Sequence, residues 1–415
     1  MKSRIRINEY NILSILIIYM PLHYYLCDII LKNSQVDNIL RDIVIAFLFV
    51  IHLYKYGLKT SKIGLLIAII AIIMFFQSIV SVVNGNPYAI NSLRTYVVPS
   101  LLYFIVKDLK IDCKKAKKLL YYLLVEMALI GMWGLFQAFV LGDSFLVRIG
   151  YPTVEGHLGA PYYINGYYGH QRSVGTFISA NYCGLILAIF ILLSVSLDYY
   201  RKKKIGNVIT ICLAISLVAT ISRSSILALA IAIVYYAFFE WKISAKTIVK
   251  ILTVIFAGIV VIIIVDRFAL NGMLLKMVID GVSSALSFND ASSRKHMMDL
   301  FEPINTVLEN FFGTGFGNNG PMVLSKVKDA YNVESSIYLM MLETGAVFGL
   351  LYYIPFIRCI VMAPFSSLKR KKVSATVVLL VFITFIFLPN VQCFEILFYV
   401  YIALGVYDNR QPFIT

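Results

Sequence analysis

The chain has 415 residues, of which 60% are hydrophobic and 14% are charged, and its formal net charge is +15. Soluble proteins are roughly 45–50% apolar and about 25% charged, so this composition excludes an ordinary soluble domain. The basic residues stand in short segments beside apolar runs, which argues against the basic surface of a nucleic-acid-binding domain.

Apolar runs of about 20 residues, the length that crosses a bilayer as a helix, recur along the whole chain. They predict an all-α polytopic membrane protein with twelve transmembrane helices, at 11–31, 38–54, 63–83, 88–106, 119–141, 174–197, 206–221, 224–240, 247–266, 335–357, 374–389 and 391–408. The start of the chain resembles a signal peptide, but it lacks a small-residue cleavage site, so we expect an uncleaved first span. We therefore treat residues 1–415 as a single integral membrane domain.

Basic residues favour cytoplasmic loops, and here basic-rich and basic-poor loops alternate along the chain. The basic-rich set includes both ends, so we expect both termini in the cytoplasm. Two long loops, 142–173 and 267–334, are then extracytoplasmic. The six cysteines show no CxxC pair and no metal-ligand spacing, so the sequence indicates no disulfide framework, metal site or cofactor.

Arginine is enriched on the predicted outer side. It makes up seven of the twelve basic residues there, against six of the 25 on the cytoplasmic side. A guanidinium group can form two parallel hydrogen bonds to a phosphate and keeps its charge. Arg94, Arg172 and Arg223 lie at or just inside span ends, where a charge is costly and usually functional. Each could extend alone to the lipid headgroups, but three at one face favour a shared anionic ligand.

The two long loops differ in character. Loop 142–173 is dense in tyrosine, glycine and histidine, which suits either the stacking of sugar rings or an interfacial aromatic belt. In the second loop, 293–313 has apolar residues at helical spacing and predicts an amphipathic helix, either on the outer membrane surface or packed over the bundle of spans, with Arg294 in its first turn. The glycine-rich 313–320 lacks the strand and lysine of a P-loop, so we predict a flexible turn.

Four stretches occur in an order that resembles a known family: "RSVGTFISANYCGLILA" at 172–188, "ATISRSSILALAIAIV" at 219–234, "GTGFGNNG" at 313–320 and "VESSIYLMMLETGAVFGLLYY" at 333–353. With the multi-span layout and the two outer loops, they resemble the O-antigen polymerase and ligase superfamily of bacterial membrane glycosyltransferases (Wzy and WaaL types). The resemblance implies a GT-C-like fold in the bacterial plasma (inner) membrane. It also implies undecaprenyl-diphosphate-linked oligosaccharides as donor and acceptor, with a chain-length regulator and a flippase as partners.

The resemblance also implies roles for individual residues. Its first two motifs place near the donor site Arg172, Gly175, Thr176, Asn181, Ser222 and Arg223. Arg223 is the arginine expected to hold the diphosphate. Fixed guanidinium groups stabilise the negative charge that grows on a leaving diphosphate, without a metal ion. We expect Arg172 and Arg223 to do this, with Arg294 and Arg94 as supporting cations.

The acceptor hydroxyl needs a base, or a positioned acceptor for its proton. In the ligase pattern, "H-N-x-Y-L-x-x-L-x-E-x-G", a histidine opens the last motif. Here we place Glu334 at that histidine, and the downstream matches are Tyr338, Leu339, Glu343 and Gly345. Glu334 is the candidate catalytic base, although it could instead pair with an arginine, and we expect Glu343 to be a structural partner inside the bundle. Further candidates in the loops are His157, His170, Glu155 and Asp290.

These features favour a polymerase that transfers a growing glycan to a new lipid-linked repeat unit, to make O-antigen, capsule or another exopolysaccharide. A ligase that moves a finished glycan to a lipid core is the alternative within the family, and Glu334 in place of histidine argues against it. A lipid-linked oligosaccharide flippase is the alternative of another class. A flippase is expected to show two similar halves, and no internal repeat is visible in the sequence.

Overall fold

The computed structural model describes residues 8–32, 34–58, 61–154, 156–163, 171–197, 204–240, 267, 279, 303–324, 327 and 330–409. In these ranges the chain is mostly helical, with a short antiparallel hairpin of β1 (Thr153–Val154) and β2 (His157–Leu158). Within these described ranges, four helical segments are long and apolar enough to cross a membrane: Lys62–Val83, Ala89–Asp108, Cys113–Ile149 and Arg223–Glu240. The prediction of a helical membrane protein is confirmed at this level.

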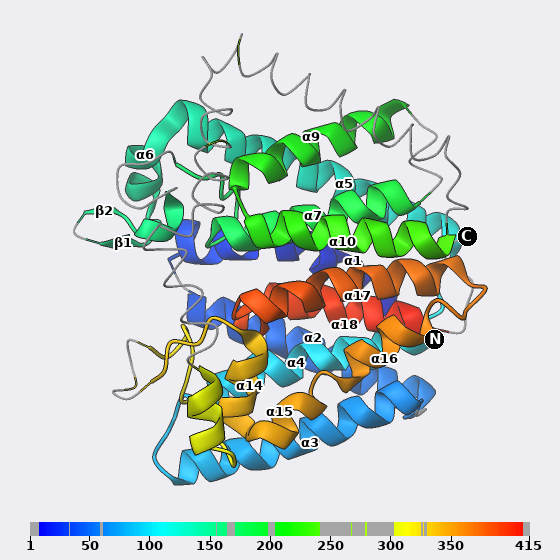
Figure 1. Cartoon of the computed structure of the whole chain (residues 1–415). Helices are drawn as coiled ribbons and strands as arrows, with labels where there is room; N and C mark the ends of the chain where they lie inside the picture. The colour runs from blue at the N-terminus through cyan, green and yellow to red at the C-terminus, as the bar shows by residue number, and fades with distance from the viewer. Residues whose placement is uncertain are drawn as a thin grey trace, which may run out of the picture.

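The helices run side by side along a common direction (Figure 1). Several start at a serine whose side chain accepts a hydrogen bond from a backbone N–H of the first turn, as Ser61, Ser179 and Ser335 do. With η for a 3₁₀- or π-helical turn, the order is α1 (Glu9–Tyr19), η1 (Met20–Leu22), η2 (Tyr25–Ile30), α2 (Ser34–Tyr56), α3 (Lys62–Val83), α4 (Ala89–Asp108), α5 (Cys113–Phe136), η3 (Gln137–Leu141), α6 (Gly142–Ile149), η4 (Ala160–Tyr162), α7 (Ala180–Ser196), α9 (Lys204–Thr220), α10 (Arg223–Glu240), α14 (Ser336–Thr344), α15 (Ala346–Leu351), α16 (Ile354–Met362), α17 (Lys369–Phe387), η5 (Asn390–Gln392) and α18 (Phe394–Asp408).

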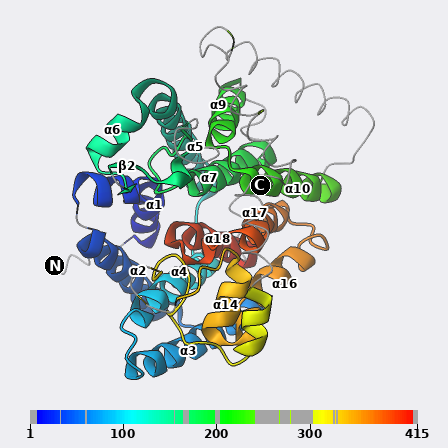
Figure 2. The same cartoon turned by 60° about the vertical axis from the view of Figure 1, so that its left-hand side comes forward.

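Helix α18 lies at the centre of the bundle, against α4 and α17 (Figure 2). It is apolar on every side, which is typical of a helix surrounded by others, and Leu397, Phe398 and Val400 are fully buried. Helix α3, in contrast, exposes apolar side chains, with 61% of Phe76 and 79% of Val83 accessible. Such an apolar outer surface suits lipid better than water.

The two ends of the bundle differ in their charged residues. Arg94 and Arg223 lie at the starts of α4 and α10, and Arg172 precedes α7, at the end where α6 and the β1–β2 hairpin stand (Figure 1). Lys55 and Lys107 lie in the last turns of α2 and α4, at the opposite end. We call these the arginine end and the lysine end.

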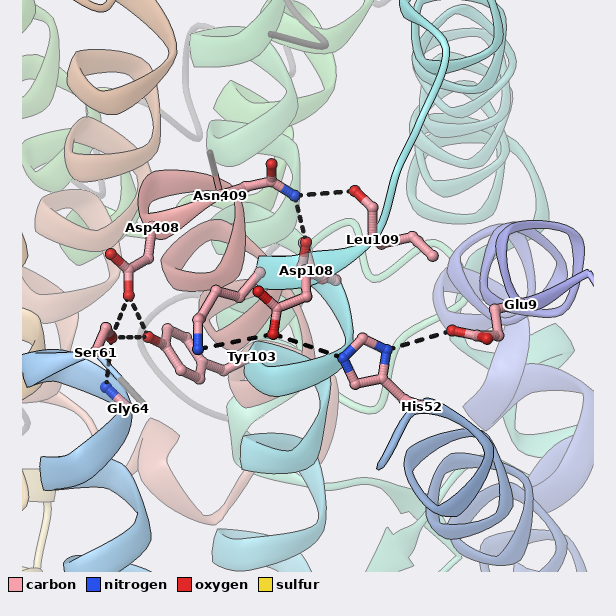
Figure 3. A network of polar contacts seen from close by, with 11 residues as sticks. Glu9, His52, Ser61, Gly64, Tyr103, Asp108, Leu109, Asp408 and Asn409 are labelled. Carbon is pink, nitrogen blue, oxygen red and sulfur yellow. Dashed lines mark hydrogen bonds and ion pairs between the residues drawn. The ribbon is translucent and has the colours of Figure 1, made fainter. Parts of the chain in front are cut away.

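A network of polar contacts joins α1, α2 and α4 at the lysine end (Figure 3). The Glu9 carboxylate lies 2.8 Å from Lys55 Nζ and 3.3 Å from His52 Nδ1. On its other side, His52 Nε2 lies 3.8 Å from Asp108 Oδ2. Each charge of this group therefore has an opposite or hydrogen-bonding partner within the protein.

The same network ties α18 to α3 and α4 (Figure 3). The Asp408 carboxylate accepts hydrogen bonds from the hydroxyls of Ser61 and Tyr103. The side-chain amide of the next residue, Asn409, donates to the carbonyls of Val106 at 2.7 Å and Leu109 at 3.1 Å. These contacts fix the last turn of the central helix against its neighbours.

One predicted span differs from the structure. Residues 335–357 were expected as one continuous helix, but the chain breaks at Gly345, whose φ of +91° favours glycine, and again at Tyr352 and Tyr353, which gives α14, α15 and α16. Backbone groups of another segment take up the bonds lost at the break, since Thr314 N donates to Leu342 O at 2.7 Å and Ala346 N donates to Phe311 O at 2.9 Å. Non-helical backbone is tolerated at membrane depth when it is satisfied within the protein in this way.

The glycine-rich segment 313–320 was predicted to be a flexible turn, and the structure instead holds it tightly. The buried Phe316 ring stacks edge-on against Tyr96, and Phe316 N donates to Ser81 Oγ at 2.9 Å. At Gly317, which has a φ of +78°, a Cβ atom would lie 2.7 Å from Ala89 Cα, so only glycine fits. The segment is a packed element between the α3–α4 turn and α14.

Candidate functional site

Arg172 lies over the turn that joins α9 to α10. Its Nε donates to Thr220 O at 2.8 Å and its Nη2 donates to Ile221 O at 3.4 Å. Ile221 has a φ of +49°, which is rare for a β-branched residue and shows that the turn is sharply constrained. The guanidinium group therefore holds the start of α10 in place.

The other nitrogens of Arg172 connect this turn to its surroundings. Nη2 donates to Asn181 Oδ1 at 2.7 Å, at the start of α7, and Nη1 donates to Pro161 O at 3.2 Å, in η4. Burial, together with the positive charge of Arg223, lowers the pKa of Arg172 to about 10. The group still carries its charge at neutral pH, in a position set by four acceptors.

Arg223 is the first residue of α10, and it is exposed. The start of a helix presents unsatisfied N–H groups and the positive end of the helix dipole, which attract anions. Beneath it, the buried hydroxyls of Ser222 and Ser225 are hydrogen-bonded to each other at 2.7 Å. Neither Arg172 nor Arg223 has an acidic partner among the residues that the structure describes. Two neighbouring cations to which the described residues give no counter-ion form a candidate anion site.

Three further residues of the predicted donor site face inward. Gly175 has a φ of +59°, and a Cβ there would lie 3.0 Å from the Ile130 side chain. Thr176 is buried, and its hydroxyl donates to the carbonyl of Pro21 at 2.6 Å. Ser222 is fully buried as well. These residues fix the backbone that carries Arg172 and Arg223, and their side chains are not turned toward a ligand.

Arg94 belongs to a second cluster at the same end. Its Nε lies 2.9 Å from Asp42 Oδ2, and the other oxygen of Asp42 lies 3.0 Å from Arg41 Nη2. The sequence suggested Arg94 as a supporting cation for a ligand. The structure pairs its charge with a carboxylate, so Arg94 has a counter-ion already.

The second cluster continues into the centre of the bundle. Arg41 Nη1 lies 3.2 Å from His23 Nε2, and His23 Nδ1 lies 3.2 Å from Glu395 Oε1. The Arg41 guanidinium also lies 3.4 Å above the centre of the Phe394 ring, a cation–π contact. Arg41, Asp42 and Glu395 stand out in the sequence as charges within spans, but nothing there pairs them with one another or with His23.

The two clusters are neighbours. Asn181, which binds Arg172, is followed by Tyr182, and Tyr182 lies close to Cys393 and Glu395. The Thr176–Pro21 hydrogen bond joins the same two regions from the other side, two residues before His23. The segment that contains Arg172 and Asn181 is therefore joined to the segments that carry His23 and Glu395.

Glu334 precedes Ser335, whose side chain caps α14, and it is partly buried. Its assignment by motif depends on Glu343 and Gly345 alone, because the Tyr–Leu pair of the pattern falls one residue before Tyr338 and Leu339 in that register. The side chain of Tyr338 packs against the main hydrophobic core.

Glu343 lies deeper than Glu334 and is only 2% exposed. Its carboxylate accepts hydrogen bonds from Tyr96 OH at 3.1 Å and from Asn319 N at 3.4 Å. Asn319 belongs to the glycine-rich segment, so Glu343 joins α14, α4 and that segment. These contacts are those of a structural partner, the role we expected for it.

Several residues named from the sequence lie outside the described residues: Arg294, Glu155, His170 and Asp290. His157 lies in β2. An amphipathic helix was predicted at 293–313, and the structure describes a helical stretch of it at 303–309. There Val307 is buried and Leu308 is exposed, so the two faces of this stretch differ. Among the described residues, no three His, Cys, Asp or Glu side chains are grouped so that they could hold a metal ion.

A polar hollow of about 390 Å³ lies between the α3–α4 turn and the glycine-rich segment. Amide and hydroxyl side chains line it, among them Ser81, Asn84, Asn86, Thr314 and Asn318. The sequence gave no signal for this hollow, because it forms only where two segments more than 200 residues apart meet, as the hydrogen bond from Asn86 Nδ2 to Phe316 O shows.

Comparison with known proteins adds no assignment. No protein-family model matches the chain, and no curated protein shows significant similarity to it.

Proposed function

We propose that the chain is a glycosyltransferase of the bacterial plasma membrane that joins undecaprenyl-diphosphate-linked oligosaccharide repeat units into a surface polysaccharide. The observation that supports this most is the pair of Arg172 and Arg223, two adjacent cations for which the described residues supply no acidic partner. Like charges placed together raise the free energy of the empty site, and a bound anion removes this cost. A lipid-linked diphosphate is an anion that stays at the membrane surface.

In the proposed reaction, the acceptor hydroxyl oxygen forms a bond to the anomeric carbon of the donor while the bond from that carbon to the diphosphate breaks. The electron pair leaves with the diphosphate, whose negative charge grows. Arg223 at the start of α10 and the already positioned Arg172 stabilise that charge without having to reorganise. The hydrogen bonds from Arg172 to Thr220 and Asn181 support this preorganisation.

The hydroxyl proton must pass to a base, and Glu334 remains our candidate because it is a partly buried carboxylate at the start of α14. A Glu334→Gln variant is expected to bind the lipid donor as wild type does but to lose turnover. Binding can be measured with purified protein and undecaprenyl diphosphate in detergent, and turnover as polymer formed. Unchanged turnover in this variant would remove Glu334 as the base.

The polar hollow beside the glycine-rich segment supports a sugar substrate. Neutral amide and hydroxyl groups such as Asn84 and Ser81 suit the hydroxyls of a glycan. With the arginine end at the outer face of the membrane, this proposal includes twelve spans, a GT-C-like arrangement and both termini in the cytoplasm. Transfer of a finished glycan to a lipid core would use the same groups with another acceptor.

Deletion of the gene tests the function directly. A polymerase deletion should leave single repeat units on the surface glycan, seen as short bands on a gel, and complementation with the wild-type gene should restore the ladder. Lipid-linked polymer that accumulates free of its final acceptor would indicate the ligase instead. Repeat units trapped in the cytoplasm would indicate a flippase and would overturn the proposal.

A further inference from the structure

The polar hollow between the α3–α4 turn and the glycine-rich segment has hydrogen-bonding groups that the described fold leaves free. The side-chain amide of Asn84 lines the hollow and is exposed, and no described residue bonds to it. Asn318 donates one of its two amide N–H groups to Thr314 O at 2.7 Å. Ser81 Oγ accepts from Phe316 N at 2.9 Å, and its own proton has no acceptor among the described residues. Donors and acceptors therefore line the hollow together, as the recognition of hydroxyl groups requires.

The wall of the hollow is held in shape by the fold. Asn86 donates to Phe316 O at 3.2 Å and to Asn318 Oδ1 at 2.5 Å, and its own Oδ1 accepts from Tyr88 N at 3.0 Å. A wall that is already ordered lowers the entropic cost of binding. Tyr88 also lines the hollow, and an aromatic ring can stack on the apolar face of a sugar. The volume of about 390 Å³ is at the lower end of the range for ligand pockets, about 300–1,000 Å³, so it suits a short part of a glycan.

The hollow and the pair of Arg172 and Arg223 lie at the same end of the bundle but on different sides of it. Helix α4 packs against α18, α18 against α17, and α17 against α10, which begins with Arg223. Both views show α17 and α18 between α3 and α10 (Figure 1 and Figure 2). An α-helix with its side chains is about 10 Å across. A sugar in the hollow is therefore not the one whose anomeric carbon is bonded to a diphosphate at Arg223.

We propose that the hollow is a recognition subsite for a sugar residue of the oligosaccharide that lies away from the bond being formed. Asn84, Ser81 and Asn318 bond to hydroxyl groups of this residue, and Tyr88 stacks on its ring. The inference rests on the proposed function, which supplies a glycan long enough to extend from the arginine pair to the hollow. Contacts remote from the reacting carbon let an enzyme select its whole substrate, here the repeat unit, and not the diphosphate alone.

Binding of the glycan without its lipid tests the subsite. The probe is the repeat-unit oligosaccharide that mild acid releases from the strain's own undecaprenyl-diphosphate-linked precursor. Its binding to the purified full chain is measured by isothermal titration calorimetry. Asn84→Ala should bind it roughly five-fold more weakly than wild type, the effect of about one lost hydrogen bond. Asn91→Ala is the matched control and should bind normally, because Asn91 is exposed in the first turn of α4 and is not among the residues that line the hollow.

Binding of undecaprenyl diphosphate, measured on the same proteins, separates the subsite from the proposed reaction. Asn84→Ala should bind this lipid as wild type does and should keep the thermal transition of wild type, because its side chain is exposed. A wild type that binds the lipid but not the oligosaccharide, or equal oligosaccharide binding by Asn84→Ala and Asn91→Ala, would overturn the subsite and leave the proposed reaction standing. Oligosaccharide binding that depends on Asn84 in a protein that does not bind the lipid would support the subsite and contradict the proposed reaction.

Discussion

The two ends of the bundle treat charge in opposite ways. At the lysine end, Glu9 contacts Lys55 and His52, and Asp408 accepts two hydroxyls, so the charges satisfy one another inside the protein (Figure 3). At the arginine end, Arg172 and Arg223 lie close enough to lower the pKa of Arg172, and the described residues give them no carboxylate. At the lysine end the fold supplies the partners, and at the arginine end we propose that a bound anion supplies them.

This comparison shows why a count of charged residues does not identify a site. The arginine end also contains Arg94 and Arg41, and both are paired with Asp42. A charge with a fixed partner contributes to structure, because its desolvation is already compensated. Arg172 and Arg223 have no such carboxylate among the described residues, and we therefore infer that they are available for a ligand.

The largest expected effect comes from breaking the buried chain of charges. Arg41→Met should lower the free energy of unfolding by about 3–5 kcal/mol, because it leaves Asp42 and Glu395 with fewer partners in a buried position. The decrease in stability can be measured as a shift of the thermal unfolding transition in detergent, followed by size-exclusion chromatography. A stability equal to that of wild type would mean that Arg41 does not form these contacts in the folded protein.

The next effect concerns ligand binding at Arg172 and Arg223, the cations to which the described residues give no carboxylate. Arg223→Lys keeps the charge but removes the planar, two-pronged contact, a loss of about 1.5–3 kcal/mol that corresponds to roughly ten- to hundred-fold weaker binding of undecaprenyl diphosphate. Arg148→Lys, at another exposed arginine near the end of α6, should bind as wild type does. If both variants lose affinity equally, Arg223 is not distinguished from the other arginines at this end, and the proposed contrast between cations with and without a carboxylate partner is wrong.

A pH series separates Arg172 from an ordinary cation. The pKa of Arg172 is lowered to about 10 by burial and by Arg223, so the wild type should bind undecaprenyl diphosphate nearly equally well from about pH 7.5 to 9, where the terminal phosphate, with a second pKa of about 6, is already ionised. A lysine starts from an ordinary pKa of about 10.4 and meets the same burial and repulsion. Arg172→Lys should therefore lose affinity as the pH rises within that range. Affinity that stays flat in this variant would show that the site does not repel a second cation.

The smallest effect is expected at the lysine end. Asp408→Asn keeps one oxygen that can accept from Ser61 or Tyr103, so it should cost only about 0.5–1.5 kcal/mol of stability. Donor binding and polymer length should not change. A strong loss of polymer in this variant would mean that the two ends are coupled, and the division of roles between them would have to be abandoned.

Much of the candidate site could be predicted from the sequence, but not its pairing. Arg172, Arg223 and Asn181 were grouped by motif, and the structure joins them through the Arg172–Asn181 hydrogen bond and the turn at Thr220. Arg94 was placed in the same group, yet its partner Asp42 comes from another helix. Whether a cation faces a ligand or a carboxylate depends on neighbours that are distant in the chain. A single sequence does not show which distant residues become those neighbours.

The sequence by itself determined that the chain is helical and suited to a membrane, because length and apolarity of a segment are local properties. It also determined which end of each helix carries arginine or lysine. Only the tertiary structure decided that the helix after Ser335 breaks at Gly345, that 313–320 packs against α4, and that an apolar cavity lies between α1, α4, α5, α7, α17 and α18. These features depend on close contacts between distant segments, where backbone bonds and cavity walls come from different parts of the chain.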